Sequence, residues 1–529
     1  MKSKVFLLLA ASLMVVSCNK AASSEAPKSS INDSSVVPAT SVSSDRGTSS
    51  EQKSSSDAPS SAKGSSAQPS SSSAKPSSSA QPSSSAQPSS SSSASSSEAP
   101  LVEPYHAKVE SMLLTDEEGK PIDVEFDVPK DYLSFTNKSS VFSKNLAIEA
   151  LSFVAAAPYK DVLGELYTYH SFDNIYYSED YDKEQEKDSV LFSLAHKKMG
   201  REDLVVLSLS GYNYKKQWEQ NLTIGKESNH EGFAEGVKKV LPVFKEYLAK
   251  YNEPTVFVNG YSRTAAIANL MSTYVIDSEL VKESHYYAYL FETPKGVSVT
   301  NTKEYKSIFN IVNSADLVTY VAPTEYGLKR VGVDIELYSE NADAKVNEYN
   351  EKLVLPAFTP RNEDPEDASI PNFANDIDFV NFVISYLLKP VTDIGDGQQN
   401  RDISTRANFV DNIQGDAAYL VSLFFSLPSD VVEDIKTKLS EMGAFGMLGL
   451  LSTDGLYNFL TPILNEHNFA YDDAQLKAST NAVAELATQK IALLLLFASA
   501  DYKQNLMRLI DFHALETVIP LVFALNAAE

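Results

Sequence analysis

Short apolar runs alternate with helix-forming stretches through the middle of the chain. Residues 204–209, 255–258, 286–291 and 307–312 are such runs, and residues 230–247 carry apolar side chains at helical spacing. Nearly continuous apolar strands are typical of a sheet covered on both faces, and strands that alternate with helices favour parallel pairing. The pattern therefore predicts an α/β fold with a mostly parallel sheet and helices on both of its faces.

The first hundred residues do not follow this pattern. Residues 1–17 hold two early lysines and an apolar run, which is the layout of a secretory signal. Residues 19–100 are dominated by serine, with repeated proline-containing units and few large apolar side chains. Such a stretch cannot bury enough surface to offset its chain entropy. We expect a signal peptide over 1–17 and a disordered linker over 18–100.

Cys18 follows the signal segment directly and is the only cysteine of the chain. The ending Val-Val-Ser-Cys resembles the lipobox of bacterial lipoproteins, and a cysteine within an ordinary signal peptide is the alternative. The lipobox interpretation implies an exported protein on the bacterial cell envelope, held at the outer membrane or cell surface by a lipid anchor at Cys18. A single cysteine allows no internal disulfide and no thiolate zinc site.

Charge and hydropathy narrow the possible partners. The chain has 70 acidic and 45 basic residues, a formal net charge of −25, and no basic cluster. An acidic chain repels phosphate backbones, so nucleic acid is not expected as a partner. The most apolar later run, residues 491–497, is too short to cross a bilayer and is typical of a buried helix. The oligomeric state stays open.

Residues 255–270 join a predicted strand to a predicted helix through the turn Gly-Tyr-Ser-Arg-Thr. A sharp turn of this kind lifts its central residue, Ser262, off the end of the sheet and presents the hydroxyl as a nucleophile. Taken alone, these residues fit a plain turn with a capping residue equally well. Tyr212 and Asp316 also follow predicted strand ends, where parallel sheets gather reactive groups. That coincidence favours a catalytic role for Ser262.

Four segments resemble the class 3 lipases of the α/β-hydrolase superfamily, especially their secreted bacterial members. The resemblance covers roughly residues 127–332. It implies an α/β-hydrolase fold and a serine hydrolase that cleaves carboxylic esters, with acyl lipids as the expected substrates and neither a metal nor an organic cofactor. The segments are LVVLSLSGYNYKKQW (204–218), HEGFAEGVKKVL (230–241), VFVNGYSRTAAIANL (256–270) and FNIVNSADLVTYVAP (309–323).

The resemblance also implies roles for individual residues. Ser262 matches the family's nucleophile and Asp316 its triad acid. The backbone N–H groups of Tyr212 and Arg263 match the two donors of the oxyanion hole. A serine needs a histidine to remove its proton and a carboxylate to orient that histidine, so the assignment is chemically coherent.

The histidine has two candidates, because the α/β-hydrolase order Ser, Asp, His requires it to follow Asp316. His513 precedes a predicted final helix and has an acid three residues later, as in the family, so we prefer it. His467 lies at the end of a predicted helix, where a cation is favoured for structural reasons alone. His230 matches a His-x-Gly-Phe element of the family, and we expect it to pack rather than to catalyse.

Two departures from the family pattern support an alternative. Thr264 stands where the nucleophile turn normally has a glycine, and Ser-Gly-Tyr at 210–212 replaces Arg-Gly-Thr or Arg-Gly-Ser. A side chain at position 264 could distort the oxyanion hole, and losing one donor costs about a hundredfold in rate. The alternative is a catalytically degenerate surface lipoprotein that keeps the hydrolase fold as a binding or scaffold module.

Beyond residue 338 the predicted elements are all helices. We expect a lipase-like domain over 101–338, a helical cap or insertion over 339–505, and a C-terminal segment over 506–529 that returns the histidine to the site. The predicted helices span residues 373–388, 409–427, 430–451, 456–466, 474–499 and 515–525.

Overall fold

The structure is a computed structural model. The predicted signal segment, Cys18 and the predicted linker lie outside the described residues. The described residues are 103–116, 120–211, 216–322, 324–337, 342–353, 355, 357–358, 373–388, 403, 405–442, 446, 449–489, 505, 508–509 and 511–525.

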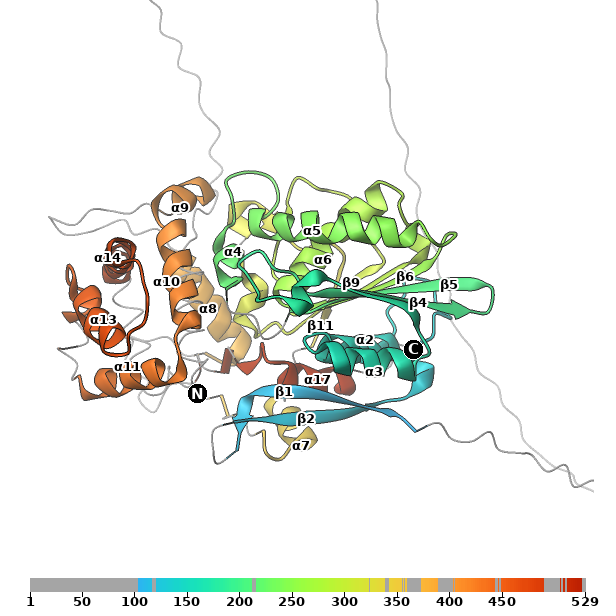
Figure 1. Ribbon diagram of the computed structural model, residues 1–529, viewed down its shortest axis with the longest axis horizontal. Coiled ribbons are helices and arrows are strands. Elements are labelled where there is room, and N and C mark those ends of the chain that lie inside the picture. The colour runs from blue at the N-terminus through green and yellow to red at the C-terminus, as the bar shows by residue number, and fades with distance from the viewer. Residues whose placement is uncertain are drawn as a thin grey trace, which may run out of the picture. The chain divides into compact units, whose positions relative to one another are not determined.

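A seven-stranded sheet forms the centre of the fold, in the order β11-β9-β7-β6-β5-β4-β3 (Figure 1). All neighbouring pairs from β5 to β11 are parallel, whereas β4 runs antiparallel to both β5 and β3. The prediction of a mostly parallel sheet is confirmed. The strands are β3 (Asp173–Tyr177), β4 (Phe192–Met199), β5 (Glu202–Leu209), β6 (Thr255–Tyr261), β7 (Tyr286–Phe291), β9 (Ile308–Val312) and β11 (Val333–Glu336).

Helices cover both faces of this sheet, as the apolar strands predict (Figure 1). Side chains alternate along β6, so Phe257 enters one hydrophobic cluster while Val256 and Val258 enter the other. The Val256 side packs against α5 (Glu231–Leu248) and α6 (Arg263–Asp277). The Phe257 side packs against α2 (Lys144–Ala156), α3 (Lys160–Tyr169) and α17 (Leu515–Ala524).

A β-hairpin that the sequence did not predict precedes α2. Strands β1 (Tyr105–Thr115) and β2 (Pro121–Val128) pair antiparallel, with an irregular register between Glu110 and Thr115. At this irregularity, Ser111 Oγ and the backbone N–H of Leu113 each donate a hydrogen bond of 2.7 Å to Oε1 of Glu516 in α17. The start of the described chain is thereby bonded to the helix that follows His513.

The later helices differ in detail from their prediction. The single helix predicted over 409–427 is wrong, because Ile413 leaves the helical region and separates two helices there. The helix predicted from residue 430 ends at Glu441, well before residue 451. Of the helix predicted over 474–499, residues 490–499 lie outside the described residues. The helices are α7 (Ala342–Tyr349), α8 (Asp376–Leu388), α9 (Arg406–Asn412), α10 (Gln414–Ser426), α11 (Ser429–Glu441), α13 (Gly455–Glu466) and α14 (Asp473–Gln489).

Helix α7 packs on α17, although the predicted boundary at residue 338 places it with the cap. The ring of Tyr349 packs at a tilt of 38° against that of Phe523 with centroids 5.8 Å apart, and its hydroxyl donates to the carbonyl of Glu125 in β2. Among the described helices, none has both the length and the hydropathy needed to cross a bilayer.

The buried Glu516 contact provides a test of the hairpin. Glu516→Ala removes the acceptor of the Ser111 hydroxyl and the Leu113 N–H, and a buried donor without a partner costs about 1–3 kcal/mol. We expect the free energy of unfolding, measured in urea, to fall by about that amount. Glu246→Ala, at an exposed position of α5, is the control and should leave stability nearly unchanged. Equal effects at both positions would contradict this account.

Candidate active site

Ser262 lies at the sharp turn between β6 and α6. Its backbone has φ 55° and ψ −128°, a region that non-glycine residues rarely occupy and that stores strain at functional sites. The N–H of Ser262 donates to the carbonyl of Phe291 in β7 at 2.9 Å, and its carbonyl accepts from Ala266 N–H at 3.1 Å. These bonds to the neighbouring strand and to the first turn of α6 hold the strained backbone in place. The predicted strand, turn and helix are all present.

The side chains of Ser262, His513 and Asp316 form a continuous hydrogen-bonded chain. His513 Nε2 lies 2.9 Å from Ser262 Oγ, and His513 Nδ1 lies 2.7 Å from Asp316 Oδ2. Asp316 follows β9 and is fully buried, and its other oxygen accepts from the N–H of Val318 at 2.8 Å. One imidazole nitrogen therefore faces a hydroxyl while the other faces a carboxylate, which is the arrangement that general-base activation of a serine requires.

Tyr261 holds the His513 segment against the sheet. Its hydroxyl donates to the backbone carbonyl of His513, and the two rings stack with centroids 5.2 Å apart. On the other side of the histidine, Thr517 Oγ1 lies 2.8 Å from the carbonyl of Asp511 and 2.7 Å from that of Ala514, which closes the turn before α17. The sequence does not indicate the Tyr261 contacts, because their partner His513 lies 252 positions further along the chain.

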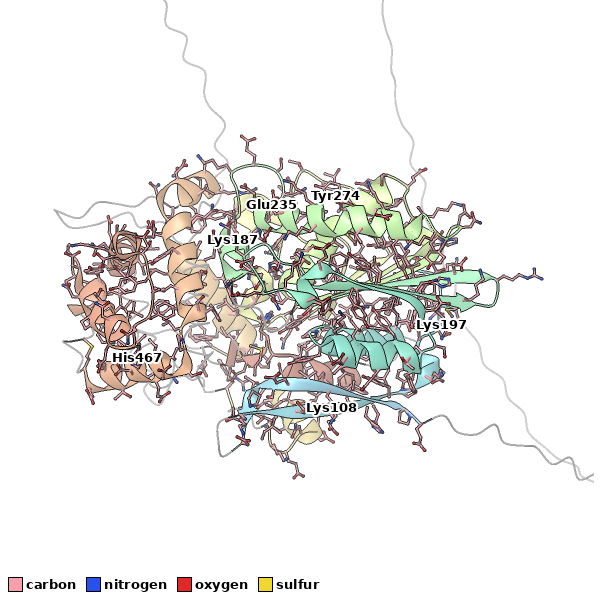
Figure 2. All side chains as sticks on the ribbon, in the orientation of Figure 1. Lys108, Lys187, Lys197, Glu235, Tyr274 and His467 are labelled. Atoms are coloured by element: carbon pink, nitrogen blue, oxygen red, sulfur yellow. The ribbon has the colours of Figure 1, made fainter. Side chains whose placement is uncertain are left out.

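His467 lies in the helical cap, where Figure 2 labels it, and it contacts two aspartates of α11. Its Nδ1 is 3.1 Å from Asp430 Oδ2 and its Nε2 is 3.2 Å from Asp434 Oδ2. It is also the C-cap of α13, in agreement with the structural role expected for a histidine at the C-terminal end of a helix. Both ring nitrogens are therefore paired within the cap, and the structure does not bring His467 to Ser262.

His230 has the packing role expected for it. It is the N-cap of α5, and its ring stacks on Phe233 with centroids 3.8 Å apart. Burial, with the nearby positive charges of Arg406 and Arg263, lowers the pKa of His230 to about 3. The ring is accordingly neutral, so Nε2–H donates to the carbonyl of Asn221 at 3.2 Å while Nδ1 accepts from Phe233 N–H.

Thr264 connects the ends of two strands. Its hydroxyl lies 3.0 Å from the carbonyl of Tyr261 in β6 and 3.3 Å from the carbonyl of Leu209 in β5. The closest approach in this region is at Gly211 instead, where an added Cβ would lie 1.7 Å from the Tyr261 carbonyl oxygen. Position 211 therefore requires a glycine, whereas position 264 accommodates a threonine.

The two residues expected to form the oxyanion hole are Tyr212 and Arg263. Tyr212 lies outside the described residues. The role expected for Arg263 concerns its backbone N–H, and its side chain is buried, where Nη2 donates to Gln220 Oε1 at 2.6 Å and Nη1 to the Ser189 carbonyl at 3.4 Å. Gln220 belongs to α4 (Trp218–Leu222), so this bond joins the start of α6 to the short helix that follows residues 212–215.

The cap helices contact the same short helix. Trp218 of α4 stacks on Phe425 of α10 with ring centroids 4.6 Å apart and planes 8° from parallel. Arg406 of α9 donates to the carbonyls of Gly225 at 2.6 Å and Ser228 at 2.8 Å, in the loop before α5. Within the part of the chain that the structure describes, no group of three or more His, Cys, Asp and Glu side chains could hold a metal ion.

Comparison with known proteins gives a family for this segment. Residues 202–326 match the family model described as lipase (class 3). This matched segment holds both Ser262 and Asp316. The family match, the mostly parallel sheet and the strand-turn-helix at Ser262 together define the fold as that of an α/β-hydrolase. The protein is a lipase-type serine hydrolase.

Solved lipase structures resemble part of the chain. Rhizomucor miehei triacylglyceride lipase is 15% identical, over 37% of this chain and 81% of that chain, with a TM-score of 0.31. The lipase from Rhizopus microsporus var. chinensis is 16% identical, over 40% of this chain and 81% of that chain, with a TM-score of 0.29. None of the curated proteins compared with the chain matches it.

The close approach at Gly211 leads to a prediction. Gly211→Ala places a methyl group against the Tyr261 carbonyl, so the strand ends must shift, and we expect unfolding free energy to fall by about 1–3 kcal/mol. Gly415→Ala is the matched control, since its added Cβ meets nothing within 4 Å and it lies in α10. That variant should gain about 0.5–1 kcal/mol. Urea unfolding of both proteins is the measurement, and a loss at Gly415 equal to that at Gly211 would refute the assignment.

Proposed function

We propose that this protein is a serine esterase that cleaves carboxylic esters through Ser262, His513 and Asp316. The observation that carries the proposal is the unbroken hydrogen-bonded chain from the Ser262 hydroxyl through His513 to Asp316. The strained backbone at Ser262 supports it independently, because a strand-to-helix turn with this φ is how hydrolases present a nucleophile.

The reaction follows from this arrangement. Ser262 Oγ attacks the ester carbonyl while its proton moves to Nε2 of His513, and Asp316 stabilises the imidazolium through Nδ1–H. The backbone N–H groups of Tyr212 and Arg263 would hold the oxyanion. His513 then gives the proton to the leaving alcohol, and a water molecule, activated by the same histidine, releases the acid from the acyl-enzyme.

Acyl lipids are the substrate class that we propose. The support comes from the class 3 lipase match over residues 202–326 and from the lipase names of the solved structures that resemble the chain. Chain-length preference depends on the walls of the substrate site, so short and long p-nitrophenyl esters should be compared directly.

The degenerate-scaffold alternative loses its main support. It was motivated by Thr264 in the nucleophile turn, by the long serine-rich tether and by the uncertain identity of the base. Thr264 instead bonds to the ends of β5 and β6, and His513 is within hydrogen-bonding distance of Ser262. These contacts favour an active enzyme over a binding module.

Replacing the triad residues one at a time tests the proposal. Ser262→Ala and His513→Ala should each lower kcat for p-nitrophenyl esters by about a thousandfold or more, because each removes a member of a unit that acts together. His467→Ala should keep nearly the full rate, since both of its nitrogens are paired within the cap. Labelling of the wild type but not Ser262→Ala by a fluorophosphonate probe gives a second readout. Equal turnover by the wild type and Ser262→Ala would disprove the triad.

We also propose that the protein is exported and held on the bacterial cell envelope by a lipid at Cys18. The support is the apolar run that ends in Val-Val-Ser-Cys and the serine-rich stretch that follows. Protease accessibility on intact cells would show whether the folded part lies outside the cell.

The anchor is tested by labelling cells with radioactive palmitate. The full chain should incorporate label and partition into detergent, whereas Cys18→Ala should do neither, because Cys18 is the only thiol of the chain. Ser34→Ala, in the serine-rich stretch, is the control and should behave as the wild type. Label retained by Cys18→Ala would rule out this attachment site.

A further inference from the structure

A second buried carboxyl lies beside the triad acid. Glu292 directly follows β7, is fully buried and has a left-handed backbone with φ 46°. Its N–H donates to the carbonyl of Ile311 in β9 at 3.0 Å, and its two carboxyl oxygens lie 3.0 and 3.2 Å from the N–H of Asn313. The N–H of Asp316 donates to the carbonyl of the same Asn313 at 2.9 Å, which holds the two buried carboxyl groups side by side. Neither the family resemblance nor the proposed triad gives Glu292 a role.

Two carboxyl groups in hydrogen-bonding contact and shielded from water share one proton, because two adjacent negative charges there are too costly. The contacts of Asp316 decide where that proton lies. Asp316 accepts from the N–H of Val318 and faces His513 Nδ1, so both of its oxygens already act as acceptors. The two oxygens of Glu292 share the single N–H of Asn313, so one of them can carry the proton and donate it.

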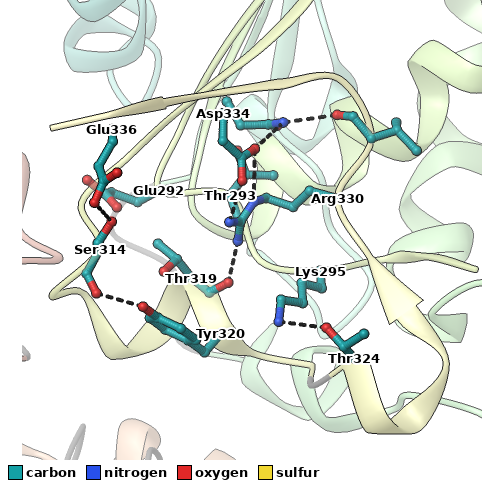
Figure 3. A network of polar contacts seen from close by, with 12 residues as sticks. Glu292, Thr293, Lys295, Ser314, Thr319, Tyr320, Thr324, Arg330, Asp334 and Glu336 are labelled. Carbon is teal, nitrogen blue, oxygen red and sulfur yellow. Dashed lines mark hydrogen bonds and ion pairs between the residues drawn. The ribbon is translucent and has the colours of Figure 1, made fainter. Parts of the chain in front are cut away.

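The charges around Glu292 agree with this assignment. Burial, followed by the negative charge of Asp316, raises the pKa of Glu292 well above its usual range. Arg330 is the cation that opposes this rise, but its guanidinium is engaged elsewhere (Figure 3). It donates to the carbonyls of Thr293 and Thr319 and pairs with Asp334 at 2.8 Å.

We propose that Glu292 is a positioning residue of the triad, and that its protonated carboxyl donates a hydrogen bond to the carboxylate of Asp316. This role rests on the proposed function of Ser262, His513 and Asp316. The donated bond fixes the plane of the Asp316 carboxylate so that one oxygen points at His513 Nδ1. It also limits the two carboxyl groups to a single negative charge. That charge stabilises the imidazolium of His513, which forms when Ser262 loses its proton.

The proposal has a pH dependence. As pH rises through the pKa of Glu292, the donor is lost and a second negative charge appears beside Asp316, so kcat should fall on the alkaline side. Glu292→Gln keeps a donor at this position without a titrating group, so that part of the pH profile should disappear. The charges that act on Glu292 are those of Asp316, before the turn 317–320, and of Arg330, after β10 (Leu328–Lys329). His513 contacts the pair through Asp316, and Figure 3 shows Asp334 and Glu336 of β11 in the surrounding polar network.

The experiment combines infrared spectroscopy with kinetics on the full chain. The wild type at pH 7 should show the carbonyl band of a protonated carboxylic acid, and Glu292→Gln should lack it. In kinetics with a p-nitrophenyl ester, Glu292→Leu should lower kcat by about tenfold to a hundredfold with KM little changed, because Asp316 loses its donor. Glu292→Gln should recover most of that loss. Glu246→Gln, at an exposed position of α5, is the control for both measurements.

The possible results separate this role from the proposed function. An unchanged carboxylic-acid band in Glu292→Gln would overturn the protonated state without reference to any activity. Wild-type kcat in Glu292→Leu, or equal losses in Glu292→Leu and Glu292→Gln, would overturn the positioning role. A protein that turns over no ester in any form, yet loses the band in Glu292→Gln, would contradict the proposed function and the positioning role while the assigned proton stands.

Discussion

The strained backbone at Ser262 is the constraint on which the rest of the site depends. A non-glycine residue with φ 55° persists only where its surroundings over-determine it. Here the restraint comes from the hydrogen bond of Ser262 N–H to β7, from the first turn of α6, and from the hydroxyl of Thr264 against the ends of β5 and β6. Gly211 lies against the Tyr261 carbonyl because the ends of β5 and β6 must approach each other for the turn to form.

The histidine is supplied by the far end of the chain, and its position depends on contacts with the start of the described chain. Glu516 accepts hydrogen bonds from Ser111 and Leu113 at the irregular part of β1, and Tyr261 contacts both the ring and the carbonyl of His513. The buried acid of α17 therefore attaches the histidine segment to the N-terminal hairpin, and the residue before the nucleophile attaches it to the sheet. These bonds join residues more than 250 positions apart.

The cap and the catalytic turn share a set of contacts through α4. Phe425 of the cap stacks on Trp218, and Gln220 of the same short helix accepts from the buried guanidinium of Arg263, directly after the nucleophile. Arg406 adds bonds to the loop before α5. Since Gln220 bonds to the residue directly after Ser262, α4 joins the cap helices to the turn that holds Ser262.

The sequence by itself determined the strands, the turn at Ser262 and the class of fold, because apolar periodicity and a glycine-containing turn are local properties of the chain. It also limited the base to two histidines and placed Asp316 at a strand end. It did not predict the hairpin, whose partner in α17 is about 400 residues away. Only the tertiary structure brings His513, and not His467, to Ser262, since that depends on where the last helix docks. The fit of Thr264 and the burial of Glu292 likewise depend on neighbours that lie on other strands.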